Sequence, residues 1–111
     1  MKAPRPHVEA ALESIAAIES YRPDTEQDFL VDQRTQDAVL MRLQDIGENL
    51  SRIRRDFPNF WDTHAAEDRK QAVGLRNVIS RDNGSIRLDL IWVVLNRDLG
   101  SLANSLRSSI L

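Results

Sequence analysis

The apolar residues of the central segment, Gln33–Asp56, recur in alternating steps of four and three, and this spacing constrains the fold most. Only an α-helix places such residues on one stripe. The stripe consists of Val39, Leu43, Ile46, Leu50, Ile53 and Phe57. A second stripe of the same spacing runs through residues 87–108, at Leu88, Trp92, Leu95, Leu99, Leu102 and Leu106. Two such stripes must bury themselves against other helices, so the sequence predicts a helical bundle.

The rest of the chain adds shorter helical signals. Residues 6–22 carry apolar side chains at helical spacing and stop at Pro23, and a similar pattern covers residues 65–80. Asp24 and Thr25 offer N-cap oxygens to a short turn, and residues 59–64 indicate an aromatic connector or a single helical turn. No segment alternates with period two for long enough to predict a strand. We therefore expect an all-α bundle of four main helices plus one or two short helical turns, forming one domain over residues 1–111.

Composition excludes several classes of protein. A chain of 111 residues fits one domain, and the absence of cysteine excludes disulfide scaffolds, thiolate nucleophiles and cysteine-based metal sites. The longest apolar run, residues 90–95, is far shorter than the ~20 residues that span a bilayer. We therefore expect a cytoplasmic protein with no membrane partner. The net charge of −2 argues against broad duplex binding but not against a local phosphate site, and thirteen arginines outnumber two lysines.

The sequence offers no metal or cofactor motif. The two histidines, His7 and His64, lack metal-ligand spacing, and each is interpreted as an ordinary surface residue. The chain has no phosphate-cradling glycine loop and no Gly-x-Ser-x-Gly nucleophile elbow. We expect no cofactor.

The segment 74–83 places polar groups within an apolar run. Arg76 and Asn77 are flanked by Leu75, Val78 and Ile79. An arginine there must reach solvent, pair with a carboxylate or bind a ligand. Glu48 and Asp45 are the candidate carboxylates. From the residues alone, a buried ion pair and a ligand site both remain open, and in the first case Arg76→Ala should cost about 3–5 kcal/mol of stability.

Four blocks of sequence, in this order and spacing, carry a resemblance to a known family: residues 29–39, 43–50, 74–79 and 88–92, the last leading into residues 98–99. The chain resembles HepT-type toxins of the HEPN superfamily along nearly its whole length. The resemblance implies a small helical bundle that forms a symmetric homodimer. It also implies a metal-independent ribonuclease of a prokaryotic toxin–antitoxin pair, whose partners are an RNA substrate and an MntA-type nucleotidyltransferase antitoxin.

The family motif is Arg, four residues, His, one residue, Tyr, and this chain departs from it twice. Arg76 matches the arginine, whereas Arg81 stands at the histidine position and Asn83 at the tyrosine position that the antitoxin modifies with AMP. The resemblance assigns catalysis to Arg76, Arg81 and Asn77, modification to Asn83 and support to Glu48. A guanidinium cannot serve as a base near neutral pH, because its pKa exceeds about 12. We therefore expect this chain to be catalytically inactive, either as an altered toxin or as a natural degenerate homologue.

Other interpretations stay open beside this one. The chain could be a non-catalytic helical protein that binds a nucleotidyltransferase or RNA, or a purely structural bundle. The aromatic residues Phe57, Phe60 and Trp61 are interpreted as core or dimer contacts rather than a platform for a base. The arginines of residues 52–55 are interpreted as the solvated end of the long helix rather than an RNA-steering patch.

Overall fold

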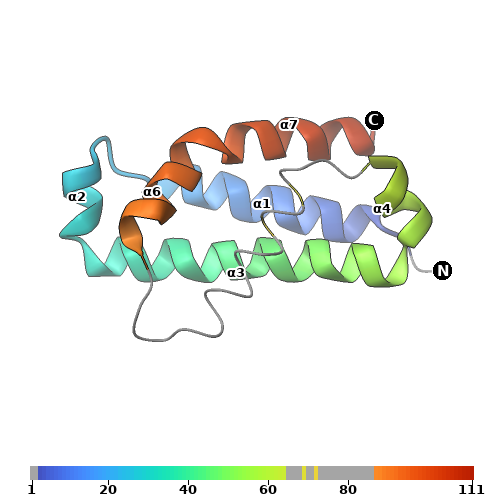
Figure 1. Ribbon diagram of the computed structural model, residues 1–111, viewed down its shortest axis with the longest axis horizontal. Coiled ribbons are helices and arrows are strands. Elements are labelled where there is room, and N and C mark those ends of the chain that lie inside the picture. The colour runs from blue at the N-terminus through green and yellow to red at the C-terminus, as the bar shows by residue number, and fades with distance from the viewer. Residues whose placement is uncertain (1–2, 65–68, 70–71, 73–86) are drawn as a thin grey trace.

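A computed structural model of the 111-residue chain describes residues 3–64, 69, 72 and 87–111, and all regular structure in those residues is helical (Figure 1). The helices are α1 (Arg5–Tyr21), α2 (Glu26–Leu30), α3 (Gln33–Asp56), α4 (Pro58–His64), α6 (Leu88–Arg97) and α7 (Leu99–Ser109). The predicted all-α class is confirmed. The predicted helix over residues 65–80 lies outside the described residues.

Helices α1, α3 and α7 run along the long axis of a molecule that measures 44 × 27 × 23 Å (Figure 1). Contacts near the start of α1 reach the end of α3, and contacts in the middle of α1 reach the middle of α3, so these two helices are antiparallel. A hydrogen bond from Arg5 Nη2 to the carbonyl oxygen of Ile110, 2.6 Å long, joins the start of α1 to the chain's C-terminal end. Both ends of the chain therefore lie at the same end of the bundle (Figure 1).

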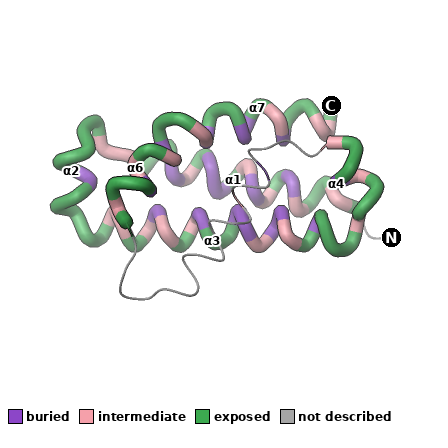
Figure 2. Tube along the Cα trace, viewed as in Figure 1, coloured by how far each residue is buried: buried purple, intermediate pink, exposed green. Residues whose placement is uncertain are grey.

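The two predicted apolar stripes form the core. The five apolar stripe residues of α3 are each at most 4% exposed: Val39, Leu43, Ile46, Leu50 and Ile53. In the C-terminal stripe, Leu95, Leu99, Leu102 and Leu106 are buried as well. Leu88 and Trp92 are partly buried and pack on the same cluster. The buried positions face inward between α1, α3 and α7 (Figure 2). Burial of these side chains is the main source of stability for helices of this kind.

The C-terminal segment differs from the prediction of one continuous helix over residues 87–108. It divides at Asp98, which ends α6 and begins α7 with φ −105° and ψ −30°. Asp98 and the following Gly100 both have low helix propensity, so the break falls where a continuous helix is weakest. The division lets α6 turn toward α2, where the rings of Phe29 and Trp92 lie 5.6 Å apart.

The aromatic connector over residues 59–64 is helical and belongs to α4, which begins at Pro58. Proline fits the first turn of a helix, since its missing N–H would be unpaired there in any case. Trp61 is only 5% exposed and belongs to the core, which confirms its interpretation as a packing residue. Phe57 and Phe60 are partly buried against the same cluster. In the part of the chain that the structure describes, no helix has the length and apolar character needed to cross a bilayer.

Helices α2 and α3 each begin with a residue whose side chain caps the helix N-terminus. The Thr25 hydroxyl accepts a hydrogen bond from the N–H of Asp28 at the start of α2. Asp32 Oδ1 accepts from the N–H of Thr35, and Oδ2 accepts from the Thr35 hydroxyl at 2.7 Å, at the start of α3. The hydrogen bonds from Thr35 hold the pKa of Asp32 below its usual value.

We expect Asp32→Ala to lower the melting temperature, and Asp32→Asn to leave it nearly unchanged at neutral pH, because asparagine also caps helices well. The folded-state pKa of Asp32 is lowered, so its contribution is present above the unfolded-state pKa and is lost as pH falls through the folded value. Asp32→Asn should therefore remove part of the acid sensitivity of folding below about pH 4. Thermal unfolding followed by circular dichroism at neutral and acid pH measures both effects. Equal melting temperatures for Asp32→Ala and Asp32→Asn would contradict the capping role.

Candidate functional site

Most of the residues that the sequence assigned to the site cannot be placed from the structure. Arg76, Asn77, Arg81 and Asn83 lie outside the described residues, so their assigned roles remain predictions. Glu48 lies within α3 and can be described.

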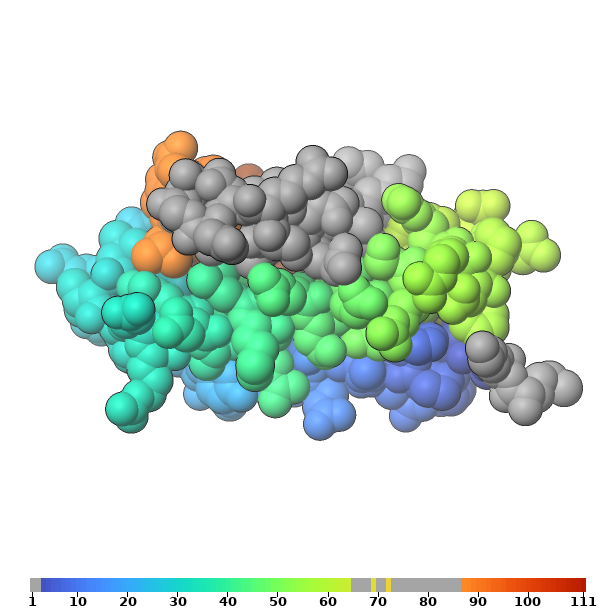
Figure 3. All heavy atoms as spheres, turned by 90° about the horizontal axis from the view of Figure 1, so that it is seen from below, coloured from blue at the N-terminus to red at the C-terminus, as the bar shows by residue number. Residues whose placement is uncertain are grey.

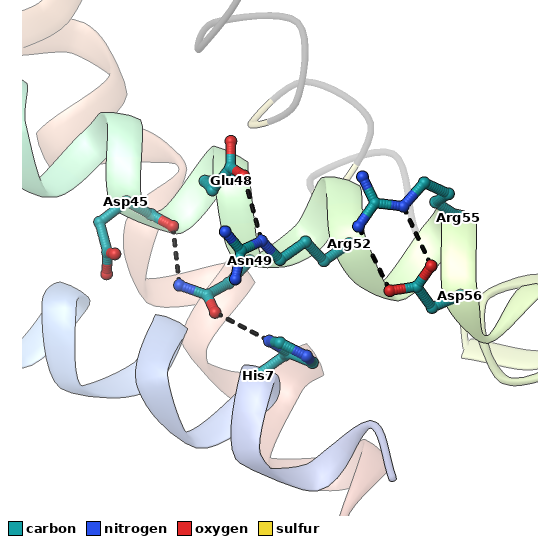
Figure 4. A network of polar contacts seen from close by, with 7 residues as sticks. All are labelled: His7, Asp45, Glu48, Asn49, Arg52, Arg55 and Asp56. Atoms are coloured by element: carbon teal, nitrogen blue, oxygen red, sulfur yellow. Dashed lines mark hydrogen bonds and ion pairs between the residues drawn. The ribbon is translucent and has the colours of Figure 1, made fainter. Parts of the chain in front are cut away.

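Glu48 pairs with an arginine of its own helix. Its Oε1 lies 3.1 Å from Nε of Arg52, one helical turn further on, and both side chains are well exposed at 38% and 49%. Exposed pairs of this spacing contribute about 0.3–0.5 kcal/mol. The interaction fixes the Arg52 side chain beside Glu48 (Figure 4). A pairing of Glu48 with Arg76 involves a residue outside the described part of the chain and stays a prediction.

Asp45, the other candidate carboxylate, contacts α1. The hydroxyl of Ser14, which is fully buried, donates a hydrogen bond of 2.6 Å to Asp45 Oδ2. Nη1 of Arg42 also lies 3.4 Å from the Ser14 oxygen. Burying a hydroxyl costs free energy unless it is hydrogen-bonded, so Asp45 satisfies a polar group at the α1–α3 interface. This contact is structural and lies about one turn from Glu48 along α3.

The sequence indicates an exposed surface position for His7, but the structure places this side chain between two helices. The side chain is half-buried between α1 and α3, and its Nδ1 lies 3.1 Å from Oδ1 of Asn49 (Figure 4). Asn49 is itself buried, and its Nδ2 donates a 2.9 Å hydrogen bond to the carbonyl oxygen of Asp45. The interpretation of His7 as an ordinary surface histidine is therefore wrong.

This chain of contacts fixes the tautomer of His7. A carbonyl oxygen can only accept, so the atom of Asn49 that faces Asp45 must be the amide NH₂, and the atom that faces His7 must be the amide oxygen. The oxygen in turn requires a proton on Nδ1 of His7. When the ring is neutral, its Nε2 therefore carries the lone pair and accepts hydrogen bonds.

A pocket of about 490 Å³ lies beside His7, at the end of the bundle where α1 begins and α3 ends. Its lining residues are Ala3, Pro6, His7, Glu48, Arg52, Arg55, Asp56 and Phe57. Arg55 makes a two-point contact with Asp56, with Nε 3.0 Å from Oδ1 and Nη2 3.3 Å from Oδ2. This contact raises the pKa of Arg55, so the guanidinium stays charged. The pocket thus joins two cations, two carboxylates, one imidazole and an apolar wall.

Sequence reasoning missed this pocket because none of its signals is local. His7 and Asn49 are 42 residues apart, and they meet only because α1 and α3 are antiparallel in this register. The sequence shows the arginines of residues 52–55 as a group, and their spacing alone indicates only the solvated end of the helix. Arg52 and Arg55 are exposed, which agrees with that interpretation. They also line the pocket, which the sequence did not indicate.

Two further side chains, Arg69 and His64, do not line this pocket. Arg69 is 1% exposed, and its Nη2 donates to the carbonyl oxygen of Ser105 in α7. Burial lowers the pKa of Arg69. His64 packs its ring 4.6 Å from that of Phe60, within α4. Among the residues that the structure describes, no three His, Cys, Asp or Glu side chains lie close enough to hold a metal ion.

Comparison with known proteins identifies the family. Residues 11–109 match the family described as Ribonuclease HepT-like, and the chain belongs to that family. A curated protein of Methanocaldococcus jannaschii, named "Gamma-glutamylcyclotransferase and putative RNase", is 34% identical over 92 residues. The match covers 82% of this chain but only 40% of the length of that protein. No solved structure matches the chain significantly.

Proposed function

We propose that this chain is the ribonuclease component of a prokaryotic toxin–antitoxin pair of the HepT/MntA type, and that its own catalytic centre is inactivated. The observation that carries the proposal is membership of the HepT-like ribonuclease family over residues 11–109. The matched range includes Arg76, Arg81 and Asn83, which we assign by resemblance to the arginine, histidine and tyrosine positions of the family motif. Its substrate is RNA, and we place it in the cytoplasm together with its nucleotidyltransferase antitoxin.

The active form of this chemistry needs no metal and divides the work between two side chains. A base removes the proton from a ribose 2′-hydroxyl, and the oxygen attacks the adjacent phosphorus. The bond from phosphorus to the 5′-oxygen breaks, and that oxygen takes up a proton. An arginine stabilises the negative charge that builds up on the phosphate oxygens, which is the role we propose for Arg76.

The proton transfer is the step that this chain lacks. A side chain that titrates close to neutral pH can accept and return the proton, and histidine is the usual choice. Arg81 stays protonated at every physiological pH, so it can hold a phosphate but cannot act as the base. We propose that Asn77 and Glu48 position Arg76 and take no proton themselves.

A symmetric homodimer is part of the proposal. Residues five apart on a helix point about 140° apart, so positions 76 and 81 share a site only where the helix ends, and the Asp82–Ser85 sequence is a turn signal. A two-fold axis near that turn would bring two copies of Arg76 and Arg81 around one cleft. Size-exclusion chromatography with light scattering tests this part directly, and a monomer would contradict it.

RNA cleavage by purified protein tests the catalytic proposal. The unmodified chain should leave RNA intact, whereas the Arg81→His variant should cleave it. If the variant neither binds nor cleaves RNA, with or without Asn83→Tyr, the proposed function is wrong.

A second candidate function is a non-catalytic protein that binds the nucleotidyltransferase or RNA. The replacement of both the histidine and the tyrosine favours it, because an inactive protein needs no silencing. A pull-down from the native host distinguishes the two: a nucleotidyltransferase bound by a chain whose Arg81→His variant stays inactive would favour this candidate.

Asn83→Tyr should make the chain a substrate for adenylylation. In the reaction, a tyrosine oxygen attacks the α-phosphate of ATP, the new phosphodiester carries AMP, and pyrophosphate leaves. Asparagine has no hydroxyl, so the unmodified chain should take up no label from α-labelled ATP in the presence of an MntA-type nucleotidyltransferase. Tyr21, an exposed tyrosine elsewhere in the chain, is the internal control. Labelling of the unmodified chain would show that Asn83 does not occupy the modified position.

A further inference from the structure

We propose that the pocket between the first turn of α1 and the last two turns of α3 binds one nucleotide of single-stranded RNA. Arg52 and Arg55 hold its phosphate, Phe57 contacts its base, and His7 fixes its orientation through a hydrogen bond. The choice of RNA as the ligand rests on the proposed function. The pocket itself is defined by residues that the structure describes, independently of positions 76–83.

The two arginines have nitrogen atoms available for a phosphate. Arg52 uses only Nε in its contact with Glu48, and Arg55 uses Nε and Nη2 in its contact with Asp56. Within the described part of the chain, both Nη atoms of Arg52 and Nη1 of Arg55 make no hydrogen bond. The two residues are three apart on α3 and therefore lie on neighbouring positions of one helix face. Guanidinium groups bind phosphate oxygens in two-point contacts.

The carboxylates of Glu48 and Asp56 hold the arginines in place. Each carboxylate engages the Nε side of its arginine (Figure 4). This arrangement limits the rotamers of two long side chains before a ligand arrives, which reduces the entropy lost on binding. It also makes the four charges sum to zero, so the pocket selects a phosphate by geometry and close contact rather than by a broad positive field. The acidic net charge of the chain agrees with such a local site.

His7 adds a directional group to the pocket. Its Nδ1 is committed to Asn49, so Nε2 is the atom left for a ligand, and in Figure 4 this nitrogen lies on the side of the ring away from Asn49. No described residue makes a hydrogen bond to it. A neutral Nε2 accepts a hydrogen bond from a ribose hydroxyl or from a base N–H. The hydrogen bond to the buried Asn49 amide fixes the orientation of the ring and leaves the other ring nitrogen to face the pocket.

The remaining wall suits a base. Ala3, Pro6 and Phe57 line the pocket beside the charged groups, and the rings of His7 and Phe57 lie 6.4 Å apart at an angle of 48°. Aromatic rings are the usual contact for an unpaired base, at about 1–3 kcal/mol per base. The volume of about 490 Å³ is in the range of small-ligand sites. In Figure 3 the surfaces of α1 and α3 lie side by side along the length of the bundle.

The test compares two double variants that remove the same charge. Arg52→Ala with Arg55→Ala changes the pocket, and Arg97→Ala with Arg107→Ala changes the C-terminal helices. Arg97 is a close match for Arg55, because it makes the same contact with the next residue, Asp98, at 3.0 Å and is 70% exposed against 69%. Binding of a fluorescein-labelled single-stranded oligouridylate is measured by fluorescence anisotropy over a series of salt concentrations, and circular dichroism confirms that both variants fold.

The pocket variant should bind at least about tenfold more weakly than the unmodified chain, because two charge-assisted contacts are lost. Its salt slope should also fall by about 0.7 for each lost phosphate contact. The C-terminal variant should bind like the unmodified chain. His7→Gln should weaken binding without changing the salt slope, since its contact is not to phosphate.

Three outcomes would overturn the inference. If both double variants lose affinity equally, the arginines act only through net charge. If neither loses affinity while the unmodified chain binds RNA, the pocket is not the binding site, although the proposed function stands. If the unmodified chain binds no oligouridylate, the inference fails, and the proposed function fails with it only if the Arg81→His variant also neither binds nor cleaves RNA.

Discussion

The Arg81→His variant is expected to cleave RNA about 10²–10⁴ times faster than the unmodified chain, which is the usual contribution of a positioned acid–base group. The substitution replaces a permanent cation with an imidazole that titrates near pH 6.5. Arg76 then has the partner that the proposed chemistry requires. The rate is measured on a labelled single-stranded RNA, with growth inhibition in cells as a second readout.

Two control variants separate restored acid–base chemistry from other effects. Arg81→Gln removes the same charge without supplying a titrating group and should stay inactive. Arg76→Ala in the Arg81→His background should lose the restored activity. Cleavage by Arg81→Gln at the rate of Arg81→His would show that position 81 only needed to lose its positive charge, and the proposed division of work would be wrong.

The helices could be predicted because their signals are local. The apolar stripe of α3 depends only on residues three and four apart, and the structure gives this helix the predicted bounds, Gln33–Asp56. Pro23 and Pro58 likewise stop or start helices through their own backbone restrictions. Signals of this kind do not depend on how the helices pack.

The division of the C-terminal helix at Asp98 could not be predicted from the same signal. The apolar stripe continues across the break in the same steps, from Leu95 to Leu99 to Leu102. Such a stripe shows which side chains face the core, but it does not show whether the helix axis is continuous. The low helix propensity of Asp98 and Gly100 is the one local signal for a break at this point. The break also requires the packing of α6 on α2, which the sequence pattern does not show.

Contacts between helices could not be predicted from the sequence either, because they depend on how the helices pack. The contact of His7 with Asn49 depends on the relative register of α1 and α3, which no local pattern encodes. Glu48 pairs with Arg52 on its own helix, and its predicted support of Arg76 stays a prediction. For an exposed carboxylate, a neighbour four residues away needs no tertiary contact. The motif at positions 76–83 rests on the family resemblance, and its geometry stays a prediction.

The largest expected effect on stability is that of Phe29→Ala, at about 3–5 kcal/mol. Phe29 is fully buried although it lies on α2, a helix of five residues that would be unstable alone. Its ring packs 5.6 Å from that of Trp92 in α6, and its carbonyl oxygen accepts a hydrogen bond from Gln36 of α3. The Phe29 side chain therefore holds α2 against α6, and its removal leaves a cavity at that end of the bundle, whereas the backbone hydrogen bond to Gln36 stays.

Leu30→Ala is the matched control, because Leu30 is the next residue on the same helix and is 42% exposed. It should change the free energy of unfolding by about 0.5 kcal/mol or less. Urea unfolding followed by circular dichroism measures both variants, and tryptophan fluorescence reports on the surroundings of Trp61 and Trp92. A domain of ordinary stability, about 5–15 kcal/mol, would lose a large share of it through Phe29→Ala. Equal losses for the two variants would mean that α2 is not anchored by Phe29, and the packing of α6 against α2 would then need another explanation.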